Sequence, residues 1–227
     1  MIPDLYRIAL RHRLLIVQFP QSHTCYRIGC HQLMDPYGYH ALSCIRGAGN
    51  GTYTRHNGIA SDVVDLGESA GVKGILNAKD GHTFGFSART NRIKDYRPGD
   101  FYLPDFSMCG DTAMVSPLSM PKNNLAAVKY PGHLIDSKEK EKHALYDEVI
   151  SLHAKSFKTF VVDTAGLINK EALDVLYLFS TVYSRTRGVP FGHAHSIVTR
   201  RASFFIMKRI ALQIHAYGVF MMSQTSM

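Results

Sequence analysis

The 227-residue sequence lacks an apolar segment long enough to cross a lipid bilayer. An apolar run occurs near the N-terminus, but three arginines and a histidine interrupt it, and no small-residue cleavage site follows. Internal repeats and low-complexity tracts are also missing. These absences argue against a membrane or secreted protein, and we expect a protein of the nucleus or cytoplasm with no membrane partner.

Cysteine is scarce, with four residues in the whole chain, yet Cys25, Cys30 and Cys44 fall within one short segment. A disulfide framework would need an oxidising compartment, for which the sequence carries no address signal. The clustering therefore favours thiols that are kept reduced inside the cell and that bind a metal.

Acidic residues are outnumbered, with 18 Asp and Glu against 26 Lys and Arg, and the formal net charge is +8. An excess of positive charge favours a polyanionic partner, although many basic proteins never bind nucleic acid. Composition otherwise is that of an ordinary globular protein, with 45% hydrophobic and 19% charged residues.

Hydrophobic periodicity predicts helices that alternate with short strands, which is typical of a mixed α/β core. The helix over 137–155 is expected to bury Leu145, Val149 and Leu152, and Asn169 is expected to cap the next helix. The predicted helices are 4–18, 58–70, 137–155, 169–183 and 196–217; the predicted strands are 101–103, 112–115 and 157–163; residues 184–195 are predicted to form a loop.

Three thiols and an imidazole occur in the order Cys25-x4-Cys30-x9-His40-x3-Cys44. Such a set can close a tetrahedral zinc shell, and the turn-forming segment 35–38 would return the chain to the second ligand pair. His31 and His56 compete with the other residues for the fourth ligand position. Four protein ligands leave no open position, so a structural zinc is expected.

The same segment carries a resemblance to a known family. It resembles the zinc knuckle and the region after it at the C-terminal end of non-LTR retrotransposon reverse transcriptase polyproteins. Five motifs follow one another in the family's order: the run from Cys30 through Asp35-Pro36-Tyr37-Gly38 to His40 and Cys44, then Arg55-His56-Asn57, Arg97-Pro98-Gly99-Asp100, Asp111-x3-Val115-Ser116-Pro117 and Lys142-x3-Tyr146.

The resemblance implies an α/β fold of the restriction-endonuclease-like PD-(D/E)xK type, a mixed sheet flanked by helices with an N-terminal zinc knuckle. Residues 1–57 would form the first helix and the knuckle, and residues 58–227 would form the nuclease domain. The implied activity is magnesium-dependent nicking of DNA. The chain would be a detached or domesticated part of a polyprotein, with DNA as partner, RNA as an alternative, and a reverse transcriptase domain as a further partner.

The resemblance also assigns residues. Asp100 and Asp111 would bind magnesium, because this ion prefers carboxylate oxygens and water. Lys142 would polarise the attacking water or meet charge on the phosphate, with Tyr146 one helical turn away. Asp105 is a competitor for the position of Asp111. The residues expected to contact nucleic acid are Arg55, His56, Arg97, Arg200 and Arg201.

Two departures from the family pattern keep a second interpretation open. The family's first cysteine pair is usually C-x2-C, whereas Cys25 and Cys30 enclose four residues. Residues 72–77 lack the glutamate that the family often has there. The alternative is therefore a catalytically inactive, zinc-knuckle, nucleic-acid-binding remnant of a transposon polyprotein.

Overall fold

The structure is a computed structural model, and the part of the chain that it describes is 3–19, 24–25, 29–44, 51–76, 99–117, 129–151 and 155–224. At its centre is a four-stranded mixed sheet in the order β1-β2-β3-β4. The strands are β1 (Ile75–Leu76), β2 (Phe101–Leu103), β3 (Met108–Val115) and β4 (Ser156–Asp163). β1, β2 and β3 are antiparallel neighbours, and β4 lies parallel to β3.

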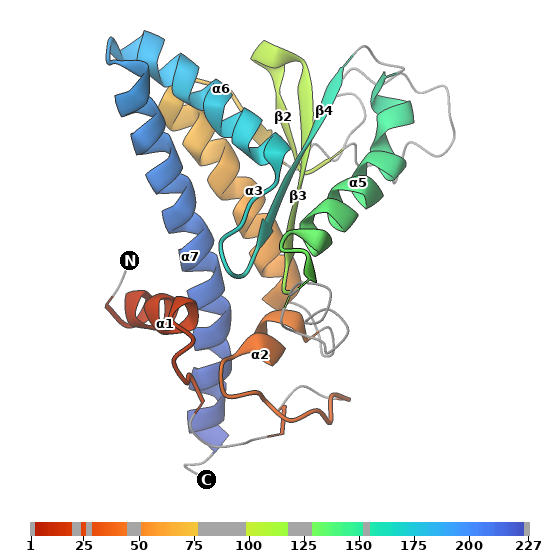
Figure 1. The fold of residues 1–227 in the computed structure, drawn as a ribbon, viewed down its shortest axis with the longest axis vertical. Helices are drawn as coiled ribbons and strands as arrows, with labels where there is room; N and C mark the ends of the chain where they lie inside the picture. Colours follow the sequence, from red (N-terminus) through yellow and green to blue (C-terminus); the bar gives the residue numbers. More distant parts are fainter. Residues whose placement is uncertain are drawn as a thin grey trace.

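Helices cover both faces of this sheet (Figure 1). α5 (His133–Ser151) lies on one face, against β3 and β4. α3 (Gly51–Ala70) and α6 (Lys170–Arg187) lie on the other face, and the long α7 (Phe191–Gln224) packs against both of them. The predicted mixed α/β class with helices on both sides of the sheet is confirmed.

The N-terminal elements pack mainly against α7. α1 (Pro3–Arg13) and the short α2 (Tyr39–Ser43) both contact α7 (Figure 1). Within the described residues, no helix combines the length and the apolar character needed to cross a membrane.

The structure has a short turn between α6 and α7 in place of the loop predicted over 184–195. α6 continues to Arg187 and ends at Gly188, which has a positive φ of 65°. The carbonyl oxygen of Pro190 accepts hydrogen bonds from the backbone of the first turn of α7. Three residues separate the two helices. Gly and Pro mark the end of one helix and the start of the next, as these residues commonly do. The Gly, His and Arg residues around them had suggested a longer loop.

The inward face of α5 also differs from the prediction. Leu145 is 57% exposed, so this member of the predicted apolar stripe does not face the sheet. The side chain of Val149 and all of Leu152 lie outside the described part of the chain. Ile135 and Ile150 are buried instead. Lys142 and Tyr146 lie between them on the same helix face, which gives the sheet-facing side of α5 a polar segment.

α3 begins at Gly51, seven residues before the predicted start, and Asn169 caps α6 as predicted by accepting a hydrogen bond from the backbone of Ala172. The earlier start places Arg55 and His56 within a helix. The domain boundary predicted between residues 57 and 58 therefore falls inside α3.

Gly110 on β3 gives a stability prediction. It is paired with Phe101, and a Cβ at Gly110 would overlap the buried Phe101 ring. We expect Gly110→Ala to lower the free energy of unfolding by about 3 kcal/mol, because neither the strand nor the ring has room to move. Chemical denaturation measures the change. Gly192→Ala, in open space on α7, is the control and should stabilise the protein by at most about 1 kcal/mol; equal effects would contradict the packing argument.

Candidate metal centres

Three cysteines and a histidine converge near the N-terminus. The ligand atoms of Cys25, Cys30, His40 and Cys44 all lie within 4.8 Å of one another. Cys25 Sγ is 3.8 Å from Cys44 Sγ, well beyond a disulfide bond of about 2.05 Å. The four residues named by the sequence pattern could therefore hold a metal ion.

The spacing within this cluster fits zinc. Tetrahedral ligands at about 2.3 Å for sulfur and about 2.0 Å for nitrogen place two sulfurs about 3.8 Å apart, and a sulfur and a nitrogen about 3.5 Å apart. The structure has 3.8 Å between Cys25 Sγ and Cys44 Sγ, and 3.4 Å between Cys30 Sγ and His40 Nε2. His31 is exposed and His56 belongs to another cluster, so the structure favours neither as the fourth ligand.

The turn at Asp35 positions the second ligand pair. Asp35 Oδ1 accepts hydrogen bonds from the backbone N–H groups of Tyr37 and Tyr39, at 2.9 and 3.0 Å. Gly38 has a φ of 87°, which suits glycine, and α2 starts at the next residue. His40 and Cys44 thus lie on and just after a short helix whose start is fixed by local sequence, as the Asp-Pro-Tyr-Gly pattern predicted.

A second cluster lies where β2 begins. Phe101 pairs with Gly110 in the β2–β3 register, so continuing the register by one residue places Asp100 opposite Asp111. Opposed residues of antiparallel strands have Cβ atoms about 5 Å apart. The carboxylate oxygens of these two residues and a ring nitrogen of His56 lie within 4.8 Å of one another. Asp105, the competitor for Asp111, is exposed and accepts a hydrogen bond from the backbone of Lys73 instead.

Asp100 is held firmly by its neighbours. Its Oδ2 accepts hydrogen bonds from the backbone N–H and the hydroxyl of Thr112, at 2.7 and 2.8 Å. Its Oδ1 lies 3.0 Å from His56 Nε2. Burial acts to raise the pKa of Asp100, but the hydrogen bonds and the nearby imidazole outweigh it and hold the pKa below its usual range. The hydrogen bond with Asp100 also raises the pKa of His56. Asp100 is therefore ionised at neutral pH.

Asp111 is the buried member of the pair, at 2% exposure. Lys142 of α5 places its Nζ 2.7 Å from Asp111 Oδ2 and forms an ion pair with it. The direction of this contact does not suit a hydrogen bond, and among the described residues Oδ2 has no hydrogen-bond partner. Burial and the adjacent Asp100 carboxylate raise the pKa of Asp111 to about 7, against the opposing effect of Lys142. Two carboxylates with opposite pKa shifts meet here, an arrangement that is frequent at functional sites.

The inward side of α5 carries further polar groups that the sequence analysis missed. Glu139, His143 and Glu171 form a third group of possible ligands. His143 Nε2 lies 2.9 Å from Glu171 Oε2, which also accepts a hydrogen bond from the backbone of Thr159. Thr159 pairs with Asp111 across β3 and β4, so this network is a direct neighbour of the carboxylate pair. The spacing of Glu139, Lys142, His143 and Tyr146 on one helix face could have indicated it.

Tyr146 lies between the charged groups and the apolar core. Its ring packs on Phe157 at 5.2 Å between centroids, and Lys142 Nζ is 5.9 Å from its centroid. The ring therefore covers one side of the Lys142 side chain and positions it toward the sheet.

The residues predicted to contact nucleic acid are scattered. Arg55 is 5% exposed and donates a hydrogen bond to the carbonyl of Leu42, so it links α3 to α2. His56 belongs to the carboxylate cluster, and Arg97 lies outside the described residues. Arg200 and Arg201 are exposed on α7, where they donate to Ser196 and Ser69.

On α7, the ring of Phe204 is 46% exposed. Arg209 forms a two-point ion pair with Asp62 on α3 and so acts within the fold. The exposed cations on this helix therefore stand beside an exposed aromatic ring.

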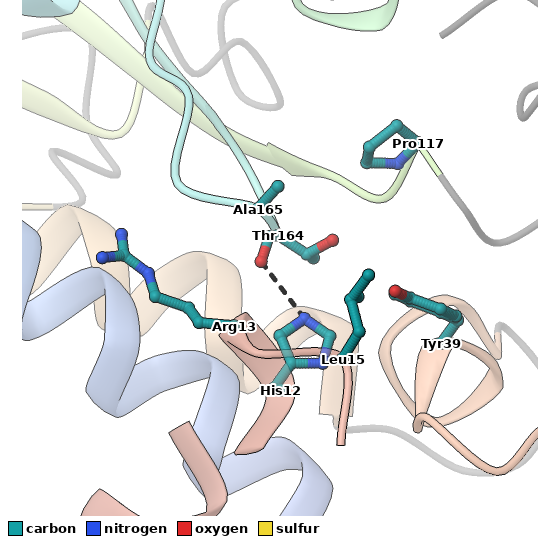
Figure 2. Close-up of a pocket in the computed structure, with 7 residues that line it drawn as sticks. All are labelled: His12, Arg13, Leu15, Tyr39, Pro117, Thr164 and Ala165. Carbon is teal, nitrogen blue, oxygen red and sulfur yellow. Dashed lines mark hydrogen bonds between the residues drawn. The ribbon is translucent and has the colours of Figure 1, made fainter. Parts of the chain in front are cut away.

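The pocket in Figure 2 lies between α1, α2 and the ends of β3 and β4, and none of its lining residues belongs to the three ligand groups. His12 Nε2 is 3.2 Å from the Thr164 carbonyl, and Nδ1 is 3.4 Å from that of Tyr37. Burial lowers the pKa of this imidazole. The contact joins α1, the segment before α2 and the end of the sheet, which is a structural role. The lining residues are His12, Arg13, Leu15, Tyr39, Pro117, Thr164 and Ala165.

Comparisons with known proteins add no relative: no protein-family model, no curated protein and no solved structure matches this chain.

Proposed function

We propose that this chain is a metal-dependent DNA endonuclease module of the PD-(D/E)xK class, derived from a retrotransposon, with a zinc knuckle at its N-terminal side. The convergence of Asp100, Asp111 and Lys142 carries the proposal. These three residues come from separate parts of the fold, and a carboxylate pair beside an ammonium group can hold a divalent cation and stabilise charge on a phosphate. The mixed sheet with helices on both faces is consistent with this class.

The carboxylate pair fits a divalent cation. Two carboxylates that approach this closely repel each other when both are ionised, and the buried Asp111 Oδ2 has an ion pair but no directional hydrogen bond within the described residues. Asp100 and Asp111 would hold magnesium, which takes one or two carboxylates, waters and substrate oxygens. When bound, the ion would lower the pKa of its water and neutralise charge on the phosphate.

The remaining groups act through charge and position. Lys142 brings a positive charge into a site that excludes most water, where it can stabilise charge that develops on the phosphate. Thr112 fixes the orientation of Asp100 through two hydrogen bonds. Positions held in this way reduce the reorganisation needed during the reaction.

The zinc knuckle is proposed to be structural. A segment as short as 24–44 buries few side chains of its own, so coordination by Cys25, Cys30, His40 and Cys44 would supply its folding energy. Tyr217 of α7 packs against this cluster, so the metal would also fix the segment to the main body.

Plasmid nicking tests the proposal. We expect the protein to nick supercoiled DNA in magnesium or manganese and to be inactive when both are chelated. DNA affinity should fall steeply with salt, because Lys and Arg contacts release counterions. The second candidate function is that of a nucleic-acid-binding remnant without nuclease activity. It is supported by the ion pair in which Lys142 already neutralises Asp111. Salt-sensitive binding with no nicking at any metal concentration would favour this remnant and reject the enzyme.

The raised pKa of Asp111 predicts how cation binding depends on pH. Below about pH 7 this carboxyl holds a proton that a cation must displace, so apparent magnesium affinity should fall about tenfold per pH unit. Above that pH the affinity should level off. In the cation-free protein, the raised pKa means that the folded state binds this proton more tightly than the unfolded state does. The stability that Asp111 contributes in this way is lost as the pH rises through about 7. Calorimetric titration across pH 5–9 (about two units on either side of this pKa) measures the dependence; an affinity independent of pH would contradict it.

A further inference from the structure

We infer that His56 is a third ligand of the cation site and makes that site prefer first-row transition-metal ions, such as manganese, over magnesium. The inference rests on the proposed function, because it assumes that Asp100 and Asp111 hold a cation. It adds a residue and a metal class that the carboxylate pair alone does not indicate.

The position of His56 supports a ligand role. It reaches the carboxylates from α3, whereas Lys142 reaches them from α5 on the other face of the sheet. Its Nε2 lies 3.0 Å from Asp100 Oδ1 and belongs, with both carboxylates, to a group whose ligand atoms are all within 4.8 Å. The three ligand atoms thus come from the residue before β2, from β3 and from α3, and they lie close enough together to share one cation.

A second observation points to a ligand between them. Asp111 is 98% buried, as its 2% exposure implies, and its Oδ2 lacks a directional hydrogen bond within the described residues. Buried carboxylate oxygens are normally hydrogen-bonded, but among the described residues this one has only the Lys142 ammonium at 2.7 Å, outside the direction of a hydrogen bond, so its place beside another carboxylate requires an explanation. A cation shared with His56 would provide it.

The ring of His56 is also oriented. Thr112 Oγ1, which donates a hydrogen bond to Asp100 Oδ2, lies 3.5 Å from Nδ1. An outer hydrogen bond at one ring nitrogen commonly fixes the other nitrogen as the ligand. Thr112 therefore orients both Asp100 and His56.

The donor types determine the metal class. Magnesium binds oxygen ligands almost exclusively and in strict octahedral geometry. Imidazole nitrogen is accepted more readily by first-row transition-metal ions. A site with two carboxylates and one imidazole should therefore bind manganese more tightly than magnesium, by about tenfold or more.

The test measures cation binding to the full chain without reference to activity. Titration calorimetry gives the affinities for manganese and magnesium, and electron spin echo spectroscopy of the bound manganese detects an imidazole nitrogen. We expect the wild type to prefer manganese and to show the nitrogen signal. His56→Glu should keep cation binding, lose the signal and narrow the preference by about tenfold, since a carboxylate replaces the imidazole. His193→Gln, at an exposed histidine of α7 outside all three ligand groups, should change neither measurement.

The outcomes distinguish the ligand role of His56 from the proposed nuclease function. If His56→Glu retains the nitrogen signal and the manganese preference, His56 is not a ligand, although the carboxylate site and the proposed function stand. If the wild type binds neither cation, or if Asp111→Asn leaves binding unchanged, the proposed function fails as well. Should His56→Glu not fold, His56→Gln provides the same test, because an amide oxygen also removes the nitrogen signal.

Discussion

Asp111→Asn is expected to reduce metal-dependent nicking by at least about 10³-fold while DNA affinity stays within about twofold. The side chain lies at the centre of the cluster, between Asp100 and Lys142, and only its carboxylate form can bind a cation tightly. An amide has nearly the same shape, and it removes the charge whose burial raises the pKa of Asp111. The fold should therefore be retained, and with it the surface that binds DNA.

Asp105→Asn is the matched control. Asp105 is also an aspartate near the β2–β3 turn, but it is exposed and lies outside the cluster, so nicking should be unchanged. Nicking is followed by the conversion of supercoiled to relaxed plasmid, and affinity by fluorescence anisotropy on a labelled duplex. If Asp111→Asn cuts as fast as the wild type, the carboxylate pair is not the catalytic centre.

Cys44→Ser is expected to abolish stoichiometric zinc binding and to unfold the segment around α2. The wild type should contain about one zinc per chain, because the four ligands close a single tetrahedral shell. Zinc binding in small structural sites is worth about 10–16 kcal/mol in isolated finger peptides, so losing one thiolate removes most of the stability of the segment. Elemental analysis and thermal melting report the two effects together.

The rest of the fold should survive this substitution in part. The main hydrophobic core is formed by α3, the sheet, α6 and α7, with Leu42 as the contribution of α2, and the cysteines belong to a second buried cluster. We therefore expect a first melting transition at lower temperature, with the sheet and its helices unfolding later.

Cys109→Ser provides the control for Cys44→Ser. Cys109 is a buried cysteine on β3, outside the cluster, and burial raises its pKa to about 12, so it remains a neutral thiol. Its replacement should leave the zinc content unchanged, even if the buried hydroxyl lowers stability. A fully folded wild type without zinc, or a Cys44→Ser protein that still holds one zinc per chain, would refute the structural site.

Features encoded by adjacent residues could be predicted from the sequence. The ligand order from Cys25 to Cys44, the turn at Asp35 and the cap at Asn169 each depend on a few neighbouring residues, and the structure has all three. Asp100 and Asp111 are eleven residues apart, a spacing that suits adjacent strands of a hairpin, and the β2–β3 register places them opposite each other. Local geometry alone is sufficient for such features.

Features that depend on distant partners could not be predicted. The apolar stripe expected on α5 contained Leu145, yet this helix turns Lys142 and Tyr146 toward the sheet. Hydrophobic periodicity identifies a helix and its most apolar side, but the side that packs is chosen by what lies opposite. Here a buried carboxylate on β3 lies opposite, and it favours a lysine over a leucine.

His56 shows the same limit at the candidate site. In the sequence it stood beside Arg55 as a nucleic-acid contact or a spare zinc ligand, because the carboxylate that it contacts is far from it along the chain. The structure starts α3 early enough to include both residues, buries Arg55 against Leu42 and directs His56 to Asp100, 44 positions away. The sequence by itself determined the two ligand-rich segments and the α/β class. Only the tertiary structure decided which side chains meet, because that depends on packing between elements that are far apart along the chain.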